Sequence, residues 1–224
     1  MVITIDGTVG SGKSTAAAGL ARRLGVAHLD TGAMYRALTL KALDGGVNLD
    51  DAQALADLAA ASVIELDGTP GAGRVRLDGR DVTQAIRENR VSVHSHYLAR
   101  QAAVRRILVE KQRAFAARVG HLVTEGRDQG TVVFPDAEVK FFLDADAAVR
   151  ARRRQLELQE RGEYRSYREV LKEVLERDAR DSTREADPLR PARDSLRVDT
   201  SAMTVEEMLD ALAAEVERRR KGTT

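Results

Sequence analysis

Short runs of apolar residues alternate along the chain with longer segments in which apolar positions recur every three or four residues. The short runs have the length of β-strands, and the longer segments have the periodicity of helices. The predicted strands are Val2–Ile5, Val26–Asp30, His121–Glu125, Val139–Leu143 and Leu196–Asp199. Strands that alternate with helices pair in parallel, so the pattern predicts an α/β fold, a three-layer sandwich with a parallel sheet between helices.

The predicted helices have recognisable ends. Lys13–Leu24 stops at Gly25, and Ala33–Leu43 stops at the pair Gly45-Gly46, because glycine readily takes the left-handed conformation that ends a helix. The remaining predicted helices cover residues 91–119 in two pieces, Ala147–Lys172 with an interruption at Gly162, and the segment after Thr204 and Glu207, whose spacing is that of a capping box.

Residues 62–83 differ in character from the rest of the chain. Two short β-like runs, Val63–Leu66 and Arg74–Leu77, flank a turn that is rich in glycine and contains a proline. Runs joined in this way pair as an antiparallel hairpin. Because the hairpin interrupts an otherwise α/β pattern, we predict a small antiparallel β insertion at 62–83.

The composition limits the class of protein. With 224 residues, 43% of them hydrophobic, the chain can form one large domain with a buried core and inserted lobes. A formal net charge of +1 argues against a nucleic-acid binder, which usually has a basic excess. No apolar run approaches the roughly 20 residues of a membrane-spanning helix. The first strand starts at Val2 and cysteine is absent, so we expect no signal peptide and a cytoplasmic location.

A phosphate-binding loop lies between the first predicted strand and the first predicted helix. Residues 7–14, GTVGSGKS, fit the pattern G-x-x-x-x-G-K-[ST] of the P-loop. Its glycines let backbone N–H groups surround an anion, and the next helix directs its positive N-terminus there. Lys13 supplies charge for the β- and γ-phosphates of ATP, and the Ser14 hydroxyl suits Mg²⁺. The expected ATP-binding residues are Gly7, Thr8, Val9, Gly10, Ser11, Gly12, Lys13, Ser14 and Thr15.

Three classes of nucleotide-binding protein share this loop. A switch GTPase should carry an Asn-Lys-x-Asp guanine-binding motif, which is absent from the sequence. A mechanical ATPase usually holds Mg²⁺ through an aspartate that ends a strand; Asp144 could imitate it, but no partner-coupling segment is visible. A small-molecule kinase needs a second anion site. The segments 30–36 and 126–131 supply it, because each follows a strand and brings an arginine, Arg36 or Arg127, to the edge where the P-loop lies.

Longer stretches of the sequence resemble the bacterial cytidylate kinase family. The resemblance rests on GTVGSGKST, LDTGAMYRAL, DGRDVTQAIR, GRDQGTVVFPDAEVKFFLDA, RRRQLELQERG, ERDARDSTR and DPLRPA, which run from residue 3 to about residue 200. Among nucleoside monophosphate kinases, GRD-x-GTVVFPDA and the insertion are specific to this family, whereas the P-loop is not. The resemblance implies transfer of phosphate from ATP to CMP or dCMP, with Mg²⁺.

The resemblance also implies a division into lobes. The implied core comprises residues 1–30, 120–149 and 172–224, and the implied monophosphate-binding lobe comprises residues 31–119, including the insertion. Residues 150–171 form a short lid rich in arginine. A lid that closes only over both substrates would exclude water and so prevent hydrolysis of ATP. We expect the chain to act as a monomer on these small-molecule substrates.

Residue roles follow from the matching positions. Thr31 stands near the base and is also expected to cap the second helix, Arg36 and Arg127 match arginines near the CMP phosphate, Arg105 and Asp128 match the cytosine readers, and Arg177, Asp181 and Arg184 match ribose and phosphate contacts. The residues expected to act on the transferring phosphate are Lys13, Arg127, Arg184 and Arg154, with Arg153 as the alternative to Arg154. Two positions depart from the family, because Thr8 replaces a proline and His96, beside Ser95, replaces a serine that helps to hold the base.

These residue types suit the chemistry. Two anions must be held in line, and several arginines are needed to cancel their repulsion. Cytosine offers an amino donor beside two acceptors, which Asp128 and Arg105 complement, whereas uracil would set a carbonyl against the carboxylate. Other interpretations stay open: Asp128 only orients Arg127 or Arg184, and Asp181 either accepts from a ribose hydroxyl or forms a lid salt bridge. For the chain as a whole, the alternatives are a uridylate or dual UMP/CMP kinase and a nucleotide-dependent switch protein.

Overall fold

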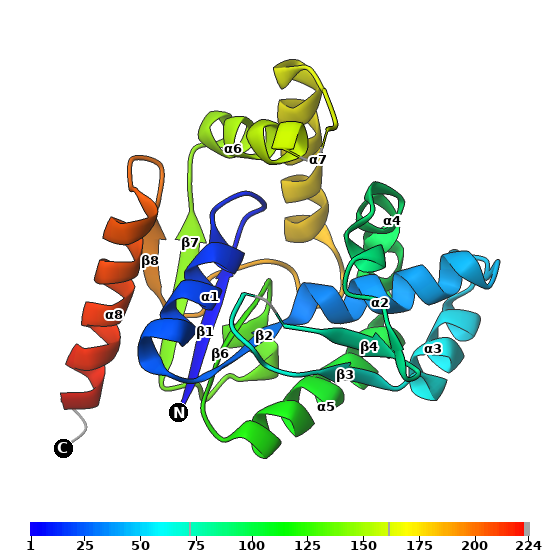
Figure 1. Cartoon of the computed structure of the whole chain (residues 1–224), viewed down its shortest axis with the longest axis horizontal. Coiled ribbons are helices and arrows are strands. Elements are labelled where there is room, and N and C mark those ends of the chain that lie inside the picture. Colours follow the sequence, from blue (N-terminus) through cyan, green and yellow to red (C-terminus); the bar gives the residue numbers. More distant parts are fainter. Residues whose placement is uncertain (72, 161, 222–224) are drawn as a thin grey trace.

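The structure is a computed structural model that describes residues 1–71, 73–160 and 162–221 (Figure 1). Its centre is a five-stranded sheet of order β2-β6-β1-β7-β8, in which all neighbours are parallel. The strands are β1 (Val2–Gly7), β2 (Ala27–Asp30), β6 (Leu122–Gly126), β7 (Val139–Asp144) and β8 (Leu196–Asp199). All five predicted strands are confirmed, and their ends differ from the prediction by two residues or fewer.

Helices cover both faces of this sheet. The covering helices are α1 (Lys13–Leu24), α2 (Thr31–Asp44), α5 (Ala102–Val119) and α8 (Val205–Lys221). α1 and α8 enclose one core around Ile3 and Phe141, and α2 and α5 enclose another around Leu29 and Leu122. Helices thus lie on both sides of the parallel sheet, which confirms the predicted sandwich. No helix in the described ranges has the length and apolar character needed to span a membrane.

A second lobe packs beside α2, on the right in Figure 1. It contains α3 (Ala52–Ala61), a sheet of β3 (Ile64–Leu66), β4 (Val75–Leu77) and β5 (Arg80–Asp81), a 3₁₀ turn (Ala85–Arg87) and α4 (Asn89–Ala99). The predicted antiparallel pairing is confirmed, and β5 adds a third strand. Residue 72 of the predicted turn lies outside the described residues. Val75 and Leu77 pack against α2, so the insertion buries the outer side of that helix.

Helix α3 was not among the predicted elements. Asp51 caps it by accepting a hydrogen bond from the backbone N–H of Ala54. Leu55 and Ala59, one turn apart, are fully buried against α5 and α2. The short helix therefore depends on tertiary packing, because most of its residues are alanine and few large apolar side chains mark it in the sequence.

Two helices lie beyond the carboxyl ends of the strands, at the top of Figure 1. The predicted interruption of the helical segment Ala147–Lys172 at Gly162 is confirmed, but the second helix begins later than predicted and runs beyond Lys172. α6 (Ala147–Glu160) ends before the predicted break, and α7 (Tyr167–Thr183) begins at a capping box formed by Ser166 and Glu169. Residue 161 of the predicted lid lies outside the described residues. α7 runs on past residue 172, so one continuous helix crosses the implied boundary between lid and core.

Candidate active site

The ends of three parallel strands bring the predicted site segments to one edge of the sheet. Across β1 and β6, Asp6 pairs with Gly126, and across β2 and β6, Asp30 pairs with Glu125. The P-loop follows β1, α2 follows β2, and the 126–131 segment follows β6. The register therefore places all three segments side by side, as the sequence predicts.

The P-loop is held by backbone geometry that needs glycine. A Cβ at Gly7 would overlap the carbonyl oxygen of Leu143 on β7, and Gly12 takes a φ of +88° at the start of α1. The Thr8 hydroxyl donates to Oδ1 of Asp144 at 2.7 Å. The departure from the family at Thr8 thus gives the loop an additional contact with β7.

Lys13 lies at the first position of α1 with a side chain that is almost completely buried. Its Nζ donates to the backbone oxygen of Thr8 at 2.5 Å. Burial lowers the pKa of Lys13 well below its ordinary value, Arg127 lowers it further, and Glu125 acts in the opposite direction. An anion bound in the loop would favour the charged form of Lys13. The positive charge of Lys13 is therefore stabilised best when phosphate is bound.

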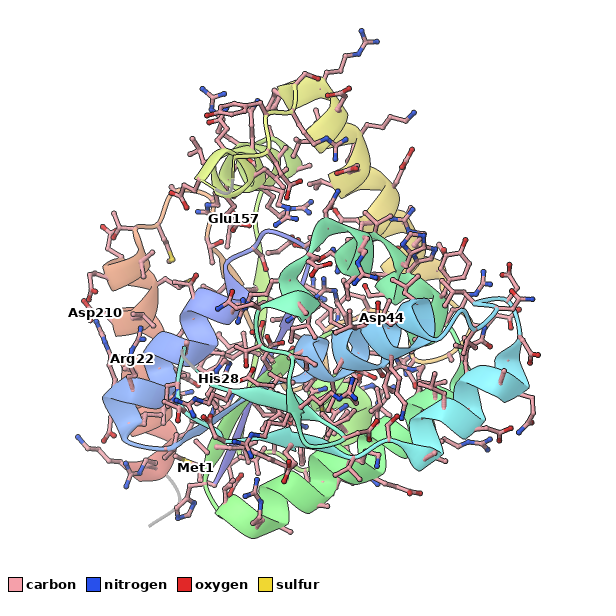
Figure 2. The ribbon with its side chains drawn as sticks, turned by 45° about the vertical axis from the view of Figure 1, so that its right-hand side comes forward. Met1, Arg22, His28, Asp44, Glu157 and Asp210 are labelled. Carbon is pink, nitrogen blue, oxygen red and sulfur yellow. The ribbon has the colours of Figure 1, made fainter. Side chains whose placement is uncertain are left out.

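The hydroxyl of Ser14 faces a carboxylate from the neighbouring strand. It donates to Oε2 of Glu125 at 2.8 Å. The other oxygen, Oε1, is buried without a hydrogen-bond partner in the described part of the chain, 3.8 Å from Nε2 of His28, which is labelled in Figure 2. A hydroxyl and an unpaired carboxylate oxygen are the hard donors that Mg²⁺ prefers, so these residues fit the ion. The sequence signal for Glu125 was its place at the end of an apolar strand.

Positive side chains crowd the space next to the P-loop. Nε of Arg127 donates to Oδ2 of Asp181 at 2.7 Å, which joins the 126–131 segment to α7. Partial burial lowers the pKa of Arg177 to about 10, and Arg127, Arg154 and Arg36 lower it as well, against the effect of Asp181. Positive charges that gather around Arg177 in this way create a site for anions.

The beginning of α2 differs from the prediction. Thr31 does not cap the helix; Asp30 does, with its Oδ1 accepting from the N–H of Ala33 at 3.0 Å. The Thr31 hydroxyl is buried and donates to the backbone oxygen of Glu125 at 2.7 Å. Oδ2 of Asp30 pairs with Arg36 at 2.9 Å. Asp30 can make both contacts because its carboxylate has two oxygens, one for the backbone N–H of Ala33 and one for Arg36.

Arg105 of α5 and Asp128 of the 126–131 segment meet in the interior of the protein. Their charged groups form a direct ion pair between Nη2 and Oδ2, and each side chain is less than a tenth exposed. Arg105 also donates from Nε to Asp187 at 2.7 Å and from Nη1 to the Tyr35 hydroxyl at 3.2 Å and the Ala99 oxygen at 3.4 Å. A guanidinium with five N–H groups and four such contacts keeps one for a ligand.

Arg184 lies close enough to Arg105, Asp128 and Asp181 to interact electrostatically with all three. Its Nε and Nη2 both donate to the backbone oxygen of Asp187, at 2.8 and 2.5 Å. Burial lowers the pKa of Arg184, and the positive charge of Arg105 adds to the effect. Asp187 thus links the predicted cytosine residues Arg105 and Asp128 to Arg184, one of the predicted phosphate residues.

The lid arginines differ in how firmly they are held. Arg153 is held by two hydrogen bonds to Thr200, from Nη1 to its hydroxyl and from Nη2 to its backbone oxygen, and the Thr200 hydroxyl also contacts the backbone oxygen of Ser11 in the P-loop. Arg154 pairs with Glu157 one turn away and is close enough to Arg177 to lower the pKa of that residue. Arg154 is thus the less firmly held of the two, and the assignment of either arginine to the transferring phosphate stays a prediction.

The departure at His96 lies on the side of α4 that carries Tyr97. The two rings lie 4.3 Å apart between centroids, and Nδ1 of His96 contacts the backbone oxygen of Val93 at 2.8 Å. The Ser95 hydroxyl donates to the backbone of Ser92. Contact of either residue with a base stays a prediction.

Asp6, which the sequence did not single out, holds the turn that carries Asp128. Its Oδ1 accepts from the N–H of Gln129 and its Oδ2 from the N–H of Gly130, both at 2.8 Å. These residues begin a short π-helical turn, Gln129–Val133. Burial raises the pKa of Asp6 from 3.8 to about 7, although the two N–H groups oppose the change.

This shift predicts a pH dependence of stability. The folded state holds the Asp6 proton more tightly than the unfolded state, so the stabilisation is complete below about pH 4 and lost as pH rises through 7. Between pH 5 and pH 8, the free energy of unfolding should fall by about 2–3 kcal/mol more in the wild type than in Asp6→Asn. Urea unfolding at both pH values measures this difference, and parallel pH profiles of the two proteins would contradict the assignment.

Comparison with known proteins gives long matches in sequence. A family model described as cytidylate kinase matches residues 3–218. The chain is 48% identical over 220 residues to a cytidylate kinase of Pelotomaculum thermopropionicum, with 98% of this chain and 97% of that protein covered. It is 46% identical to a cytidylate kinase of Pseudomonas savastanoi pv. phaseolicola, with 97% and 96% covered, and 42% identical to one of a Geobacter species, with 98% and 94% covered.

Solved structures resemble the chain at low sequence identity. A crystal structure from Thermus thermophilus matches with a TM-score of 0.53 and 18% identity, covering 97% of both chains. That of an uncharacterized protein from Eubacterium ventriosum matches with a TM-score of 0.50 and 13% identity, covering 97% of this chain and 98% of that one. At these identities, the two likenesses show a shared fold alone.

Proposed function

Because the chain belongs to the cytidylate kinase family, we propose that it transfers the terminal phosphate of ATP to CMP, giving ADP and CDP. The observation that carries this proposal is the buried Arg105–Asp128 pair, which Asp187 links to Arg184, one of the arginines proposed to bind phosphate.

The phosphate side of the site accounts for the transfer. We propose that Lys13 and the P-loop N–H groups bind the β- and γ-phosphates of ATP, while Arg36 and Arg127 bind the acceptor phosphate. Arg154 and Arg184 then add charge around the transferring group. The reaction needs alignment and charge compensation rather than a covalent intermediate, and the depressed pKa values of Lys13 and Arg177 indicate cationic groups that anions would stabilise.

The base side of the site accounts for the choice of acceptor. The free N–H on Nη2 of Arg105 would donate to the ring nitrogen or carbonyl of cytosine. Oδ1 of Asp128 would accept from the amino group of the base. Arg177 and Asp181 on α7 would contact the ribose, and Thr31 would lie near the edge of the base. The second expected acceptor is dCMP.

Mg²⁺ is the cofactor proposed to accompany ATP. Ser14 and Glu125 would hold it directly or through water, as the Ser14 hydroxyl and the buried, unpaired oxygen of Glu125 fit an ion that keeps several waters. The ion would neutralise charge on the β- and γ-phosphates. The residues of the chain do the rest: they bind the two nucleotides, align them and exclude water.

We propose that residues 150–171, the lid, close over the two substrates, above a core of residues 1–30, 120–149 and 172–224 and beside a monophosphate-binding lobe of residues 31–119. Amide hydrogens of residues 150–160 and 162–165 should exchange more slowly when CMP and a non-hydrolysable ATP analogue are bound together, because closure orders α6 over the P-loop. Amides of α8 serve as the internal control. Equal exchange of the lid amides with and without the two ligands would rule out closure.

A panel of nucleoside monophosphates with ATP tests the proposed function. CMP should support rapid formation of ADP, dCMP should substitute for it, and UMP, AMP and GMP should support little. Equal use of UMP and CMP would instead indicate a dual pyrimidine kinase. ATP turnover that no monophosphate stimulates would indicate a nucleotide-dependent switch.

We further propose a monomer in the cytoplasm whose partners are its nucleotide substrates and not nucleic acid. The near-neutral charge and the absence of cysteine support this assignment. Light scattering of the purified chain should give the mass of one copy, with or without CMP.

A further inference from the structure

Asp187 has an uncommon backbone conformation at the edge of the proposed base pocket. It follows α7, and its φ of +50° lies in the left-handed region that residues with a Cβ seldom adopt. Among the described residues other than glycine, only Asp78 shares this conformation. A strained residue persists where its surroundings hold it in place, and such residues collect at functional sites.

The contacts of Asp187 join two arginines from opposite sides of the site. Its carboxylate Oδ2 accepts from Nε of Arg105 at 2.7 Å. Its backbone oxygen accepts from both Nε and Nη2 of Arg184. One residue thus connects the arginine proposed to contact the pyrimidine with an arginine proposed to contact phosphate.

The place of the carboxylate determines how Arg105 can turn. The guanidinium is planar, so fixing Nε at Asp187 and Nη2 at Asp128 fixes the whole group and the direction of its remaining N–H. The Arg105 side chain is 3% exposed and that of Asp187 is 33% exposed, so Asp187 holds the arginine from the open side of the pocket. Without this carboxylate, Arg105 keeps Asp128 as its one ionic partner, and only the longer hydrogen bonds from Nη1 to Tyr35 and Ala99 still oppose its rotation.

We propose that Asp187 is a positioning residue that sets the orientation of Arg105 for the pyrimidine base. The proposal rests on the proposed function, since it deepens the assignment of Arg105. Asp187 does not touch the reacting phosphate. Its carboxylate acts through Arg105, while its backbone oxygen keeps Arg184 in register with the base pocket.

Two substitutions separate the carboxylate from the backbone. Asp187→Gly removes the carboxylate and accepts the positive φ, so the contacts of the backbone oxygen to Arg184 can persist. Asp187→Asn tolerates the same φ and keeps an oxygen that can accept from Nε, but it lacks the charge. Asp78→Asn and Asp78→Gly are the matched controls. Asp78 has the same φ, but it lies in the turn between β4 and β5 and pairs with Lys41 of α2.

Steady-state kinetics with ATP and CMP give the test. In Asp187→Gly, the KM for CMP should rise roughly tenfold, while kcat and the KM for ATP stay within about twofold of the wild type. The KM of Asp187→Asn for CMP should lie between those of the wild type and Asp187→Gly. The Asp78 variants should match the wild type in the KM for CMP. If Asp187 serves only through its backbone, the opposite is expected: the KM of Asp187→Gly for CMP should be equal to or lower than that of the wild type.

The outcomes distinguish this inference from the function on which it rests. If the wild type forms no CDP, the proposed function fails. If the wild type forms CDP and both Asp187 variants keep the wild-type KM for CMP, the positioning role is overturned and the proposed function stands. A fall in kcat with an unchanged KM for CMP also overturns it, since that would place Asp187 on the transfer step.

Discussion

Replacing Lys13 by methionine is expected to lower kcat by roughly 10²–10³-fold, the usual cost of removing one preorganised group that stabilises charge in a transition state. The Lys13 side chain is buried at the start of α1, and burial holds its pKa well below the ordinary value. Its charge is fully favoured only when phosphates are present, which is the condition under which transfer occurs. The loss should therefore appear mainly in kcat.

The same substitution should leave the fold intact. Methionine has a similar length and no charge to desolvate, so the free energy of unfolding should be unchanged or higher in Lys13→Met. Lys172→Met, at a side chain 77% exposed on α7, is the matched control and should keep both activity and stability. A coupled assay for ADP and urea unfolding measure the two quantities. A folded Lys13→Met protein with near-normal turnover would remove Lys13 from the transfer step.

Replacing Asp128 by asparagine is expected to narrow the preference for CMP over UMP. The amide can offer a donor where the carboxylate could only accept, so UMP loses less than CMP. For CMP, kcat/KM should fall by roughly 10–100-fold, because leaving a buried polar group unpaired costs about 1–3 kcal/mol. Asp128→Ala should also lose discrimination, without the new donor.

The ratio of kcat/KM for CMP to that for UMP separates two roles of Asp128. If Asp128 contacts the base, the ratio falls in both variants. If Asp128 only orients Arg105 or the phosphate arginines, both monophosphates suffer alike and the ratio stays constant. Asp136→Asn, at an exposed aspartate a short distance along the same segment, controls for the loss of a negative charge.

The sheet and the P-loop could be predicted because their signals are local. Each strand is a run of apolar residues ended by glycine or a carboxylate, and parallel strands buried on both faces need no more information than that. Helix α3 and the start of α7 were missed for a physical reason. The first depends on packing of Leu55 and Ala59, and the second on a capping box at Ser166 within a segment that is polar on both sides.

The site could be predicted as a set of residues but not as a network. Motifs placed Arg127 and Asp128 at one sheet edge, because that follows from strand order. The contact of Ser14 with Glu125 depends on the neighbouring strands, and the contact of Arg105 with Asp187 joins residues 82 positions apart. Asp6 was missed because its role, accepting two backbone N–H groups, exists only once the π-helical turn has formed.

The number of CDP molecules formed for each ATP consumed tests the account most directly. With wild-type protein, ATP, Mg²⁺ and CMP, we predict one CDP for each ADP and almost no inorganic phosphate, because the closed site holds the acceptor and excludes water. Without CMP, ATP should remain largely intact. Release of inorganic phosphate at a rate that does not depend on CMP, with no CDP formed, would contradict the account.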